Sequence, residues 1–287
     1  MRLAIISGKG GTGKTTVATS LARVLSEGPG RVAYLDCDVE EPNAHLFIHP
    51  QNLDVQKVAT FVPQIDRERC NGCRLCVDIC RFNALTVIRD KAMVFAELCH
   101  SCEGCKVVCP EKAVMDSSRL LGDVRTGTRN GLKLIDGCLR VGEAMAPPLI
   151  KAVRSKVGSE KRVIIDAPPG TSCPVIHSIK DSDFVLLVTE PTPFGLHDLQ
   201  LAVEVVRELG LPCGIVVNRS DLGDTKVYDY CCAEKLPILM EIPFDRDIAS
   251  IYSAGEMLVE SRPEWRERFV ELYGKIENLV DRREEEQ

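Results

Sequence analysis

The feature that most constrains the fold is a glycine-rich segment near the start of the chain, residues 8–15, which reads Gly-Lys-Gly-Gly-Thr-Gly-Lys-Thr. An apolar run at residues 3–6 precedes it and reads as a buried strand, and residues 17–25 follow with helical spacing. Glycines in this context let successive backbone N–H groups turn toward an anion at the start of a helix. The sequence therefore predicts a nucleotide-binding P-loop, and a turn that only joins strand to helix is the alternative.

The P-loop pattern gives its residues separate roles. Lys14 should reach the β- and γ-phosphates, and the Thr15 hydroxyl should coordinate magnesium. Further nucleotide contacts are expected from the rest of the loop: Gly8, Lys9, Gly10, Gly11, Thr12, Gly13 and Thr16.

Lys9 restricts the P-loop to one type. The loop resembles the deviant P-loop K-G-G-x-G-K-S/T of the MinD, ParA, Mrp and nitrogenase iron protein superfamily. That resemblance implies an ATP-dependent homodimer, in which Lys9 reaches the phosphates of the partner subunit and acts with Lys14 in catalysis. A solvated lysine beside a phosphate site is the alternative.

Two later apolar strands end in acids, at the edge where open parallel sheets bind ligands. Residues 31–38 end in Asp36-Cys37-Asp38, and residues 163–171 read V-I-I-D-A-P-P-G-T. Asp38 matches the superfamily's switch I aspartate, which orients or deprotonates the attacking water. Asp166 and Gly170 match its D-x-P-P-G motif, so Asp166 is expected to hold the magnesium shell and the Gly170 N–H to sense the γ-phosphate. Turn or helix-capping roles are the alternatives.

Two further positions concern the base. Asn218 follows a buried strand and falls where superfamily members place an asparagine against the base, and Pro243 resembles the loop that closes over adenine. Residues 218–221, N-R-S-D, also fit the N-K/R-x-D pattern that GTPases use for guanine, and a simple Asx turn is a third possibility. Lys9 favours ATP.

Eight of the fourteen cysteines fall into two runs with the spacing C-x2-C-x2-C-x3-C. This repeat is typical of bacterial two-cluster ferredoxins, in which the fourth cysteine of each run ligates the other cluster. Two 4Fe-4S clusters are therefore expected, one on Cys70, Cys73, Cys76 and Cys109, and one on Cys99, Cys102, Cys105 and Cys80. Arg81 replaces the proline that follows the fourth cysteine in the ferredoxin pattern, and two zinc sites are the alternative.

Cysteines outside these runs raise the question of a third cluster. Cys173 follows Asp166 by seven residues, the spacing at which the nitrogenase iron protein places a ligand of its subunit-bridging cluster. A second ligand has no clear counterpart, and Cys231-Cys232 is not the C-P-x-C of Mrp-type scaffold proteins. Structural burial is the alternative for these cysteines.

The order of strands and helices predicts an α/β fold. We expect a P-loop NTPase with a mostly parallel sheet flanked by helices at 1–60 and 118–287, and an inserted α+β bacterial-type ferredoxin domain at 61–117. Residues 84–88 and 92–95 should form a hairpin, and the glycines among short apolar pieces between 118 and 146 indicate hairpins or loops on the ligand face of the sheet. An apolar stripe at 265–280 predicts a helix that packs on the core rather than on a membrane.

Charge and hydropathy restrict the partners. The formal charge of -6 and pI near 5.5 disfavour non-specific nucleic-acid binding, which depends on Lys and Arg. No run of about 18 apolar residues exists, and the first apolar stretch belongs to the P-loop strand, so we expect a cytoplasmic protein that binds no membrane.

These patterns together predict a magnesium-dependent ATPase with ATP, Mg²⁺ and two 4Fe-4S clusters as cofactors. Nucleotide-driven switching of a homodimer would be coupled to electron transfer, or to iron-sulfur or metal-cofactor assembly, on a protein partner. The alternatives are a ferredoxin-like binding module that nucleotide regulates with little turnover, and a positioning ATPase of MinD or ParA type.

Overall fold

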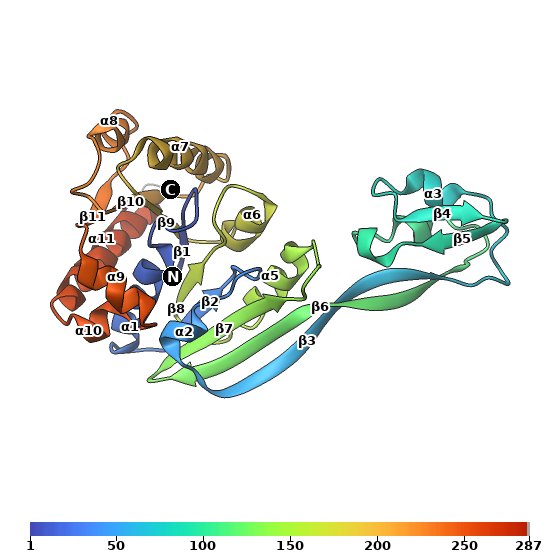
Figure 1. Ribbon diagram of the computed structural model, residues 1–287, viewed down its shortest axis with the longest axis horizontal. Helices are drawn as coiled ribbons and strands as arrows, with labels where there is room; N and C mark the ends of the chain where they lie inside the picture. The colour runs from blue at the N-terminus through green and yellow to red at the C-terminus, as the bar shows by residue number, and fades with distance from the viewer. Residues whose placement is uncertain (286–287) are drawn as a thin grey trace. The chain divides into compact units, whose positions relative to one another are not determined.

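The computed structural model describes residues 1–285, so the last two residues of the predicted segment 118–287 lie outside it. The chain forms two compact units, coloured by residue number in Figure 1. Unit 1 contains Met1–Val55, Val124–Cys138 and Ile150–Gln287, and unit 2 contains Gln56–Asp123 and Leu139–Leu149. The chain passes between the units at four points: within the long strands β3 (Gln51–Ile65) and β6 (Val114–Arg129), at the end of β7 (Leu132–Leu139) and within α5 (Ala146–Arg154). The limits 61–117 for a separately folding insert remain a prediction.

A nine-stranded sheet runs in the order β11-β10-β9-β1-β8-β2-β7-β6-β3. The strands that pair in parallel are β1 (Arg2–Ile6), β2 (Val32–Asp36), β7 (Leu132–Leu139), β8 (Arg162–Asp166), β9 (Phe184–Thr189), β10 (Cys213–Asn218) and β11 (Ile238–Ile242). Most of them are continuous runs of Val, Ile and Leu, because a strand covered on both faces has no side that must stay polar. The predicted mostly parallel α/β sheet is confirmed.

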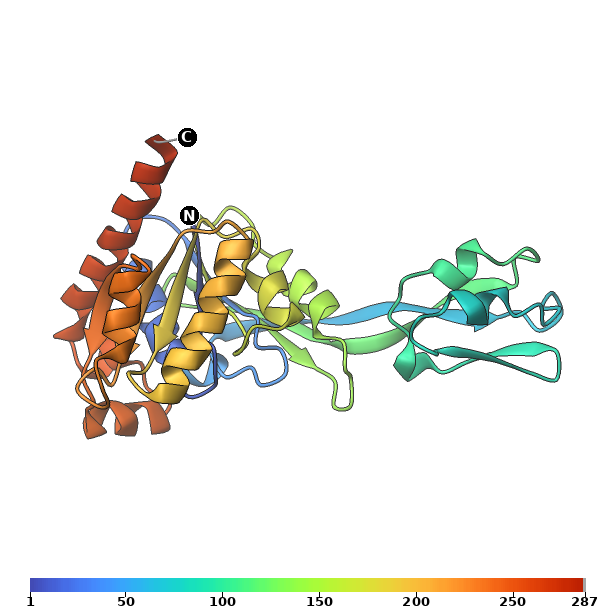
Figure 2. The same ribbon diagram turned by 90° about the horizontal axis from the view of Figure 1, so that it is seen from above.

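Helices cover both faces of the parallel strands, as Figure 2 shows. Helices α1 (Lys14–Ser26), α10 (Leu258–Ser261) and α11 (Trp265–Glu285) contribute to one core with β1. Helices α6 (Cys173–Ile179) and α7 (Pro193–Glu208) lie on the opposite side. Four further helices lie wholly or partly in unit 1: α2 (His45–Ile48), α5 (Ala146–Arg154), α8 (Lys226–Ala233) and α9 (Arg246–Ser253).

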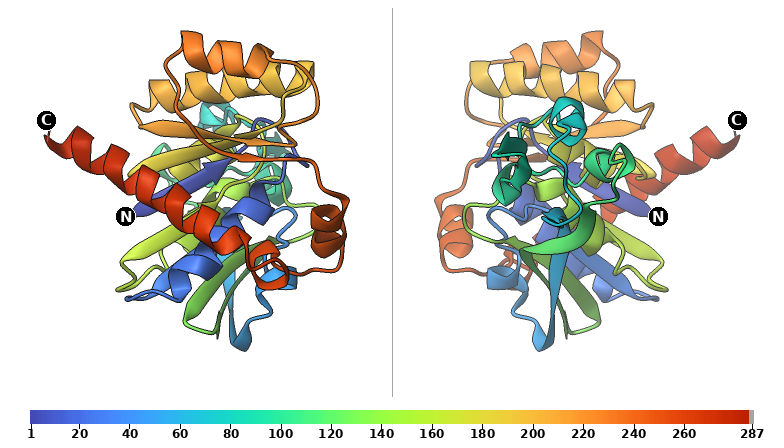
Figure 3. Two further views of the ribbon diagram at one scale, coloured as in Figure 1. Left: turned by 90° about the vertical axis from the view of Figure 1, so that its left-hand side faces the viewer. Right: turned by 90° about the vertical axis from the view of Figure 1, so that its right-hand side faces the viewer.

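The apolar stripe of the last helix belongs to this core. Trp265, Phe269, Leu272 and Ile276 are buried, and α11 packs against α1 (Figure 3). The prediction that this stripe packs on the domain is confirmed. Within residues 1–285, no helix is both long and apolar enough to cross a membrane.

Unit 2 is built from short elements. Strands β4 (Leu85–Ile88) and β5 (Lys91–Val94) form an antiparallel pair, which confirms the predicted hairpin. Around it lie α3 (Leu75–Ile79), the 3-10 helix η1 (Ala96–Leu98) and α4 (Gly104–Val107).

The expectation of hairpins or loops between 118 and 146 is confirmed by one hairpin, whose strands are longer than the short apolar pieces of the sequence suggest. Strand β6 spans 16 residues and joins β7 through Asn130 and Gly131, whose φ angles of 49° and 80° suit a two-residue hairpin. Strand β3 has 15 residues, and its first seven are all exposed, including the apolar Leu53 and Val55, so no buried face specifies this part of the strand. Pairing in the sheet, rather than local hydrophobic pattern, specifies these strands.

Phe269→Ala should reduce the free energy of unfolding by about 3–5 kcal/mol, because it opens a cavity under α11. Val270, the next residue, is 56% exposed, so Val270→Ala should change it by about 0.5 kcal/mol or less. Urea unfolding of both variants measures the difference. Equal effects would show that this helix does not contribute to the core.

Candidate functional site: a nucleotide cavity in unit 1

The glycine-rich loop connects β1 to α1, and the helix begins at Lys14. The first N–H groups of a helix lack partners within it and carry its positive end, so they favour an anion. Gly13 has a φ of 92°, and a Cβ at this position would lie 2.4 Å from Asn218 Nδ2. Asn218 donates from the same nitrogen to the Thr12 carbonyl at 2.8 Å. Asn218, predicted to face the base, thus holds the P-loop in shape.

Asp166, at the end of β8, gathers the side chains expected to bind phosphate and magnesium. Its carboxylate forms a buried ion pair with Lys14, and it accepts hydrogen bonds from Thr15 Oγ1 at 2.9 Å and from the Tyr34 hydroxyl at 2.7 Å. Burial, the largest single effect, would lower the pKa of Lys14, but the attraction and hydrogen bond of Asp166, with the charges of Asp36 and Asp38, together raise that pKa. Lys14 is therefore a cation at neutral pH, held beside the loop.

A second buried carboxylate shapes the segment that follows β2. Asp36 accepts backbone N–H groups of Asp38, Asn43 and Ala44 at 3.0–3.1 Å. Burial, and then repulsion by Asp166, raises the pKa of Asp36 to about 8. Burial likewise raises the pKa of Asp38 to about 6. Asp38 can therefore gain or lose a proton close to neutral pH.

Lys14, Thr15 and Asp38 line a cavity of about 380 Å³, whereas Asp166 and Asp36 are buried behind its wall. The P-loop, with Gly10, Gly11, Gly13, Lys14, Thr15 and Thr16, forms part of its wall. Asp38, Asn218 and Pro243 also line it, together with the aromatic rings of Phe244 and Tyr252. Its volume lies within the usual range for small-molecule pockets, about 300–1,000 Å³. Cationic and hydroxyl groups with aromatic side chains in one cavity fit a magnesium nucleotide, and Thr15 and Asp166 are the oxygen donors that Mg²⁺ prefers.

Some groups that were predicted to contact the nucleotide bond other parts of the protein in the structure. The Gly170 N–H, expected to sense the γ-phosphate, donates to the Ser7 carbonyl at 2.9 Å. Lys9 Nζ lies 3.6 Å from the Glu190 carboxylate. Gly8, Lys9 and Thr12 line a separate small pocket instead of the main cavity. The nucleotide roles of these residues remain predictions.

Tyr34 and Glu190 were not identified from the sequence, and Asp36 was noted only as an acid at the end of its strand, without a role. Tyr34 and Asp36 lie on β2 with the two-residue spacing that leads to Asp38, so strand alternation was a usable signal for them. Glu190 pairs with Lys9 and also accepts from Arg219 at 2.5 Å. Glu190 directly follows the buried strand β9, so its place after a parallel strand was a usable signal, although its partners are distant in sequence.

In unit 2, the eight cysteines of the two runs line two pockets, and each pocket draws on both runs. One is lined by Cys70, Cys73, Cys76 and Cys109, and the other by Cys80, Cys99, Cys102 and Cys105. Each set accepts two backbone N–H groups on sulfur at 3.2–3.4 Å, from Ala92 and Ala113 in the first and from Ala84 and Ser101 in the second.

The structure does not establish a metal centre. Among residues 1–285, no group of three or more His, Cys, Asp or Glu side chains is arranged to hold a metal ion. The two 4Fe-4S clusters remain a prediction. Cys173 and Cys232 are exposed and Cys231 is buried, and a bridging cluster on them is likewise untested.

The fold and the cavity define a P-loop nucleotide-binding protein. Residues 3–259 match the family described as the CobQ/CobB/MinD/ParA nucleotide binding domain. The chain belongs to this family of P-loop ATPases, which confirms the coarser part of the resemblance.

Relatives extend the comparison. An uncharacterized protein of Methanocaldococcus jannaschii is 31% identical, with 98% of each chain covered. An iron-sulfur cluster carrier protein of Aquifex aeolicus is 26% identical and covers 91% of this chain and 62% of its own length. The septum site-determining protein MinD of Pyrococcus horikoshii, solved with Mg-ADP, has a TM-score of 0.58 at 20% identity, covering 97% of this chain and 96% of that one. This last similarity shows the fold.

Thr15→Ala should abolish the strengthening of ADP binding by Mg²⁺. The hydroxyl that bonds Asp166 is removed, while the loop's backbone donors remain for phosphate. Calorimetric titration of ADP with magnesium or with EDTA measures the ratio of the two affinities. A ratio unchanged from that of the natural protein would contradict the magnesium role of Thr15.

Proposed function

We propose that the protein is a magnesium-dependent ATPase whose nucleotide cycle, run as a homodimer, acts on two 4Fe-4S clusters in unit 2. Through them it would drive electron transfer to a protein partner, or iron-sulfur or metal-cofactor assembly on it. The observation that carries this proposal is one chain that holds both the cavity at the P-loop and two four-cysteine pockets, each assembled from both cysteine runs.

The cavity contains the groups that phosphoryl transfer needs. Bound magnesium would neutralise charge on the phosphates, and Thr15 and Asp166 are the side chains that would hold it. Lys14 supplies a buried cation at the start of α1. Asp38 lines the same cavity and, with a pKa of about 6, is mainly ionised at neutral pH, as a group that positions or deprotonates water must be.

The two cysteine pockets fit cubanes by their donor chemistry. Four soft thiolates favour iron-sulfur clusters over hard cations such as Mg²⁺. A cubane keeps its four thiolates farther apart than one ion would, so thiols that share a pocket without converging on a point suit it. The backbone N–H groups directed at sulfur stabilise the ionised form. Bound clusters would supply one-electron chemistry.

Distant relatives support assembly as one purpose of this chemistry. Proteins of Aquifex aeolicus and Pyrococcus horikoshii that are 26% and 27% identical to this chain are named iron-sulfur cluster carrier proteins. A Culex quinquefasciatus homologue that is 24% identical is named a cytosolic Fe-S cluster assembly factor.

Asp38→Asn should lower kcat for ATP hydrolysis by about 100-fold or more, since an amide cannot accept the proton of water. The natural enzyme should lose activity as the pH falls through about 6, where Asp38 becomes protonated. Glu41→Gln is the matched control, because Glu41 lines the same cavity and has no assigned role. Phosphate release measured across pH tests both variants. Steady hydrolysis by Asp38→Asn would refute the assignment, and absence of turnover in the natural protein would favour the regulated binding module.

Cys109→Ser should reduce the iron content from about eight atoms per chain to about four, because it leaves one set with three thiols. Cys138→Ser changes an exposed cysteine outside both pockets, so it should retain all the iron. Iron and sulfide analysis after anaerobic purification gives the count. Equal iron in both variants would contradict the proposed ligand set.

A further inference from the structure

We infer that Lys91 and the Arg119–Glu143 pair make the two clusters unequal, so that the cluster on Cys70, Cys73, Cys76 and Cys109 accepts an electron first. This inference rests on the proposed function, since it concerns the clusters assigned there. It rests on the cation that donates a hydrogen bond to the carbonyl of the first cysteine in each run, Lys91 in the first run and Arg119 in the second.

In the first run the cation is uncompensated. Lys91, at the start of β5, donates from Nζ to the Cys70 carbonyl at 2.6 Å. The side chain is half-buried, and no carboxylate in the described part of the chain forms an ion pair with it. A positive charge therefore lies at the Cys70 backbone without an ion-pair partner among the described residues. It stabilises the reduced form, which carries one more negative charge than the oxidised form.

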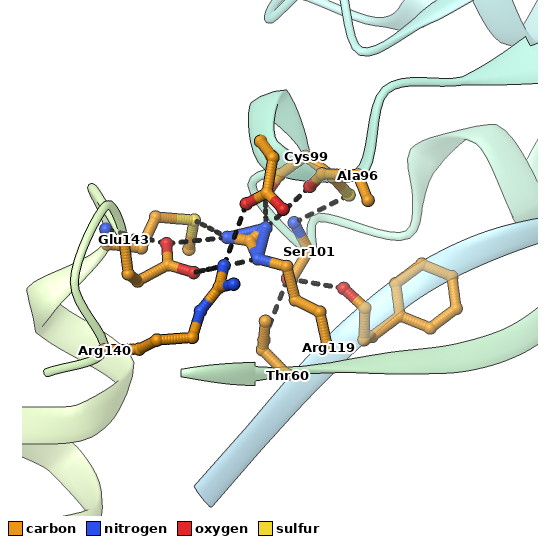
Figure 4. Close-up of polar contacts among 10 residues, drawn as sticks. Thr60, Ala96, Cys99, Ser101, Arg119, Arg140 and Glu143 are labelled. Atoms are coloured by element: carbon orange, nitrogen blue, oxygen red, sulfur yellow. Dashed lines mark hydrogen bonds and ion pairs between the residues drawn. The ribbon is translucent and has the colours of Figure 1, made fainter. Parts of the chain in front are cut away.

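In the second run the corresponding cation is neutralised, as Figure 4 shows. Arg119 donates to the carbonyls of Ala96 at 2.7 Å and Cys99 at 3.2 Å. Its guanidinium also makes two hydrogen bonds of 2.9 Å to Glu143. The side chains are only 8% and 1% exposed, so solvent screens neither charge. The pair thus fixes the Cys99 segment while adding almost no net charge.

The charged side chains that line the two pockets are all exposed, so solvent screens them and they do not separate the two clusters. They are Arg74 and Glu111 in the first pocket and Glu103 in the second, where His100 stacks on Phe82. Each run also has an exposed cation near its fourth cysteine, Arg81 or Lys112, which solvent screens.

The burial of the cysteines also favours reduction of the first cluster before the second, whereas hydrogen bonds to sulfur do not distinguish them. Cys99 and Cys105 are buried at 7% exposure, whereas none of the four cysteines in the first set is buried. Burial disfavours the added negative charge of reduction. The number of N–H groups directed at sulfur is two in each set, so these bonds do not separate the clusters.

The test is a redox titration of the full chain, purified anaerobically and followed by EPR with dithionite as reductant at pH 8. We expect two one-electron steps. Lys91→Met should disfavour the step at higher potential by about tenfold in its equilibrium constant, which is 59 mV for a one-electron couple, and leave the other step unchanged. Lys91→Arg, which keeps the charge, should retain both potentials. Glu143→Gln should raise the lower potential, because Arg119 then loses its counter-charge.

The outcomes separate this inference from the proposed function. About eight irons per chain with a single potential, or a Lys91→Met shift confined to the lower step, would overturn the inference and leave the clusters in place. Unchanged potentials in Lys91→Met would also overturn it. Iron well below about eight in the natural protein would remove the proposed function itself. The Lys91 variants decide the question even if Glu143→Gln fails to hold iron.

Discussion

The carboxylate of Asp166 is the interaction on which the nucleotide site depends. Strand β8 lies between β1 and β2, so its end is reached by the loop that follows β1 and by side chains of β2. Lys14, Thr15 and Tyr34 all bond this carboxylate, and the Asp166 carbonyl accepts the Cys37 N–H at 2.9 Å. A buried charge without such partners is strongly destabilising. The strand order, the P-loop and β2 are therefore held in one arrangement.

A second buried carboxylate, Asp36, holds the segment of the chain that leads to unit 2. Asp36 fixes the backbone at Asn43 and Ala44, and the next elements are α2 and β3, within which the chain enters unit 2. Any ligand that changes the charge around Asp36 and Asp38 thus acts on a segment joined covalently to the cysteine runs. Such a ligand shifts an equilibrium only by the difference in its affinity for the two states.

The sequence predicts those parts of the fold and site that residues close together in the chain specify. The P-loop, the parallel strands and the β4-β5 hairpin were predictable because each is specified by neighbouring residues. The length of strands β3 and β6 was not predictable because much of each strand is exposed, so no buried face specifies it. The Arg119–Glu143 pair, 24 residues apart, and the Lys9–Glu190 pair were not predictable, since only the folded chain brings these charges together.

The most direct test of the account compares the affinity of a non-hydrolysable ATP analogue, with magnesium, for the oxidised and the dithionite-reduced protein. Coupling between nucleotide and clusters must be reciprocal, so the two affinities should differ by about fivefold or more. Equal affinities in both redox states, with the clusters intact, would contradict the claim that the nucleotide cycle acts on them.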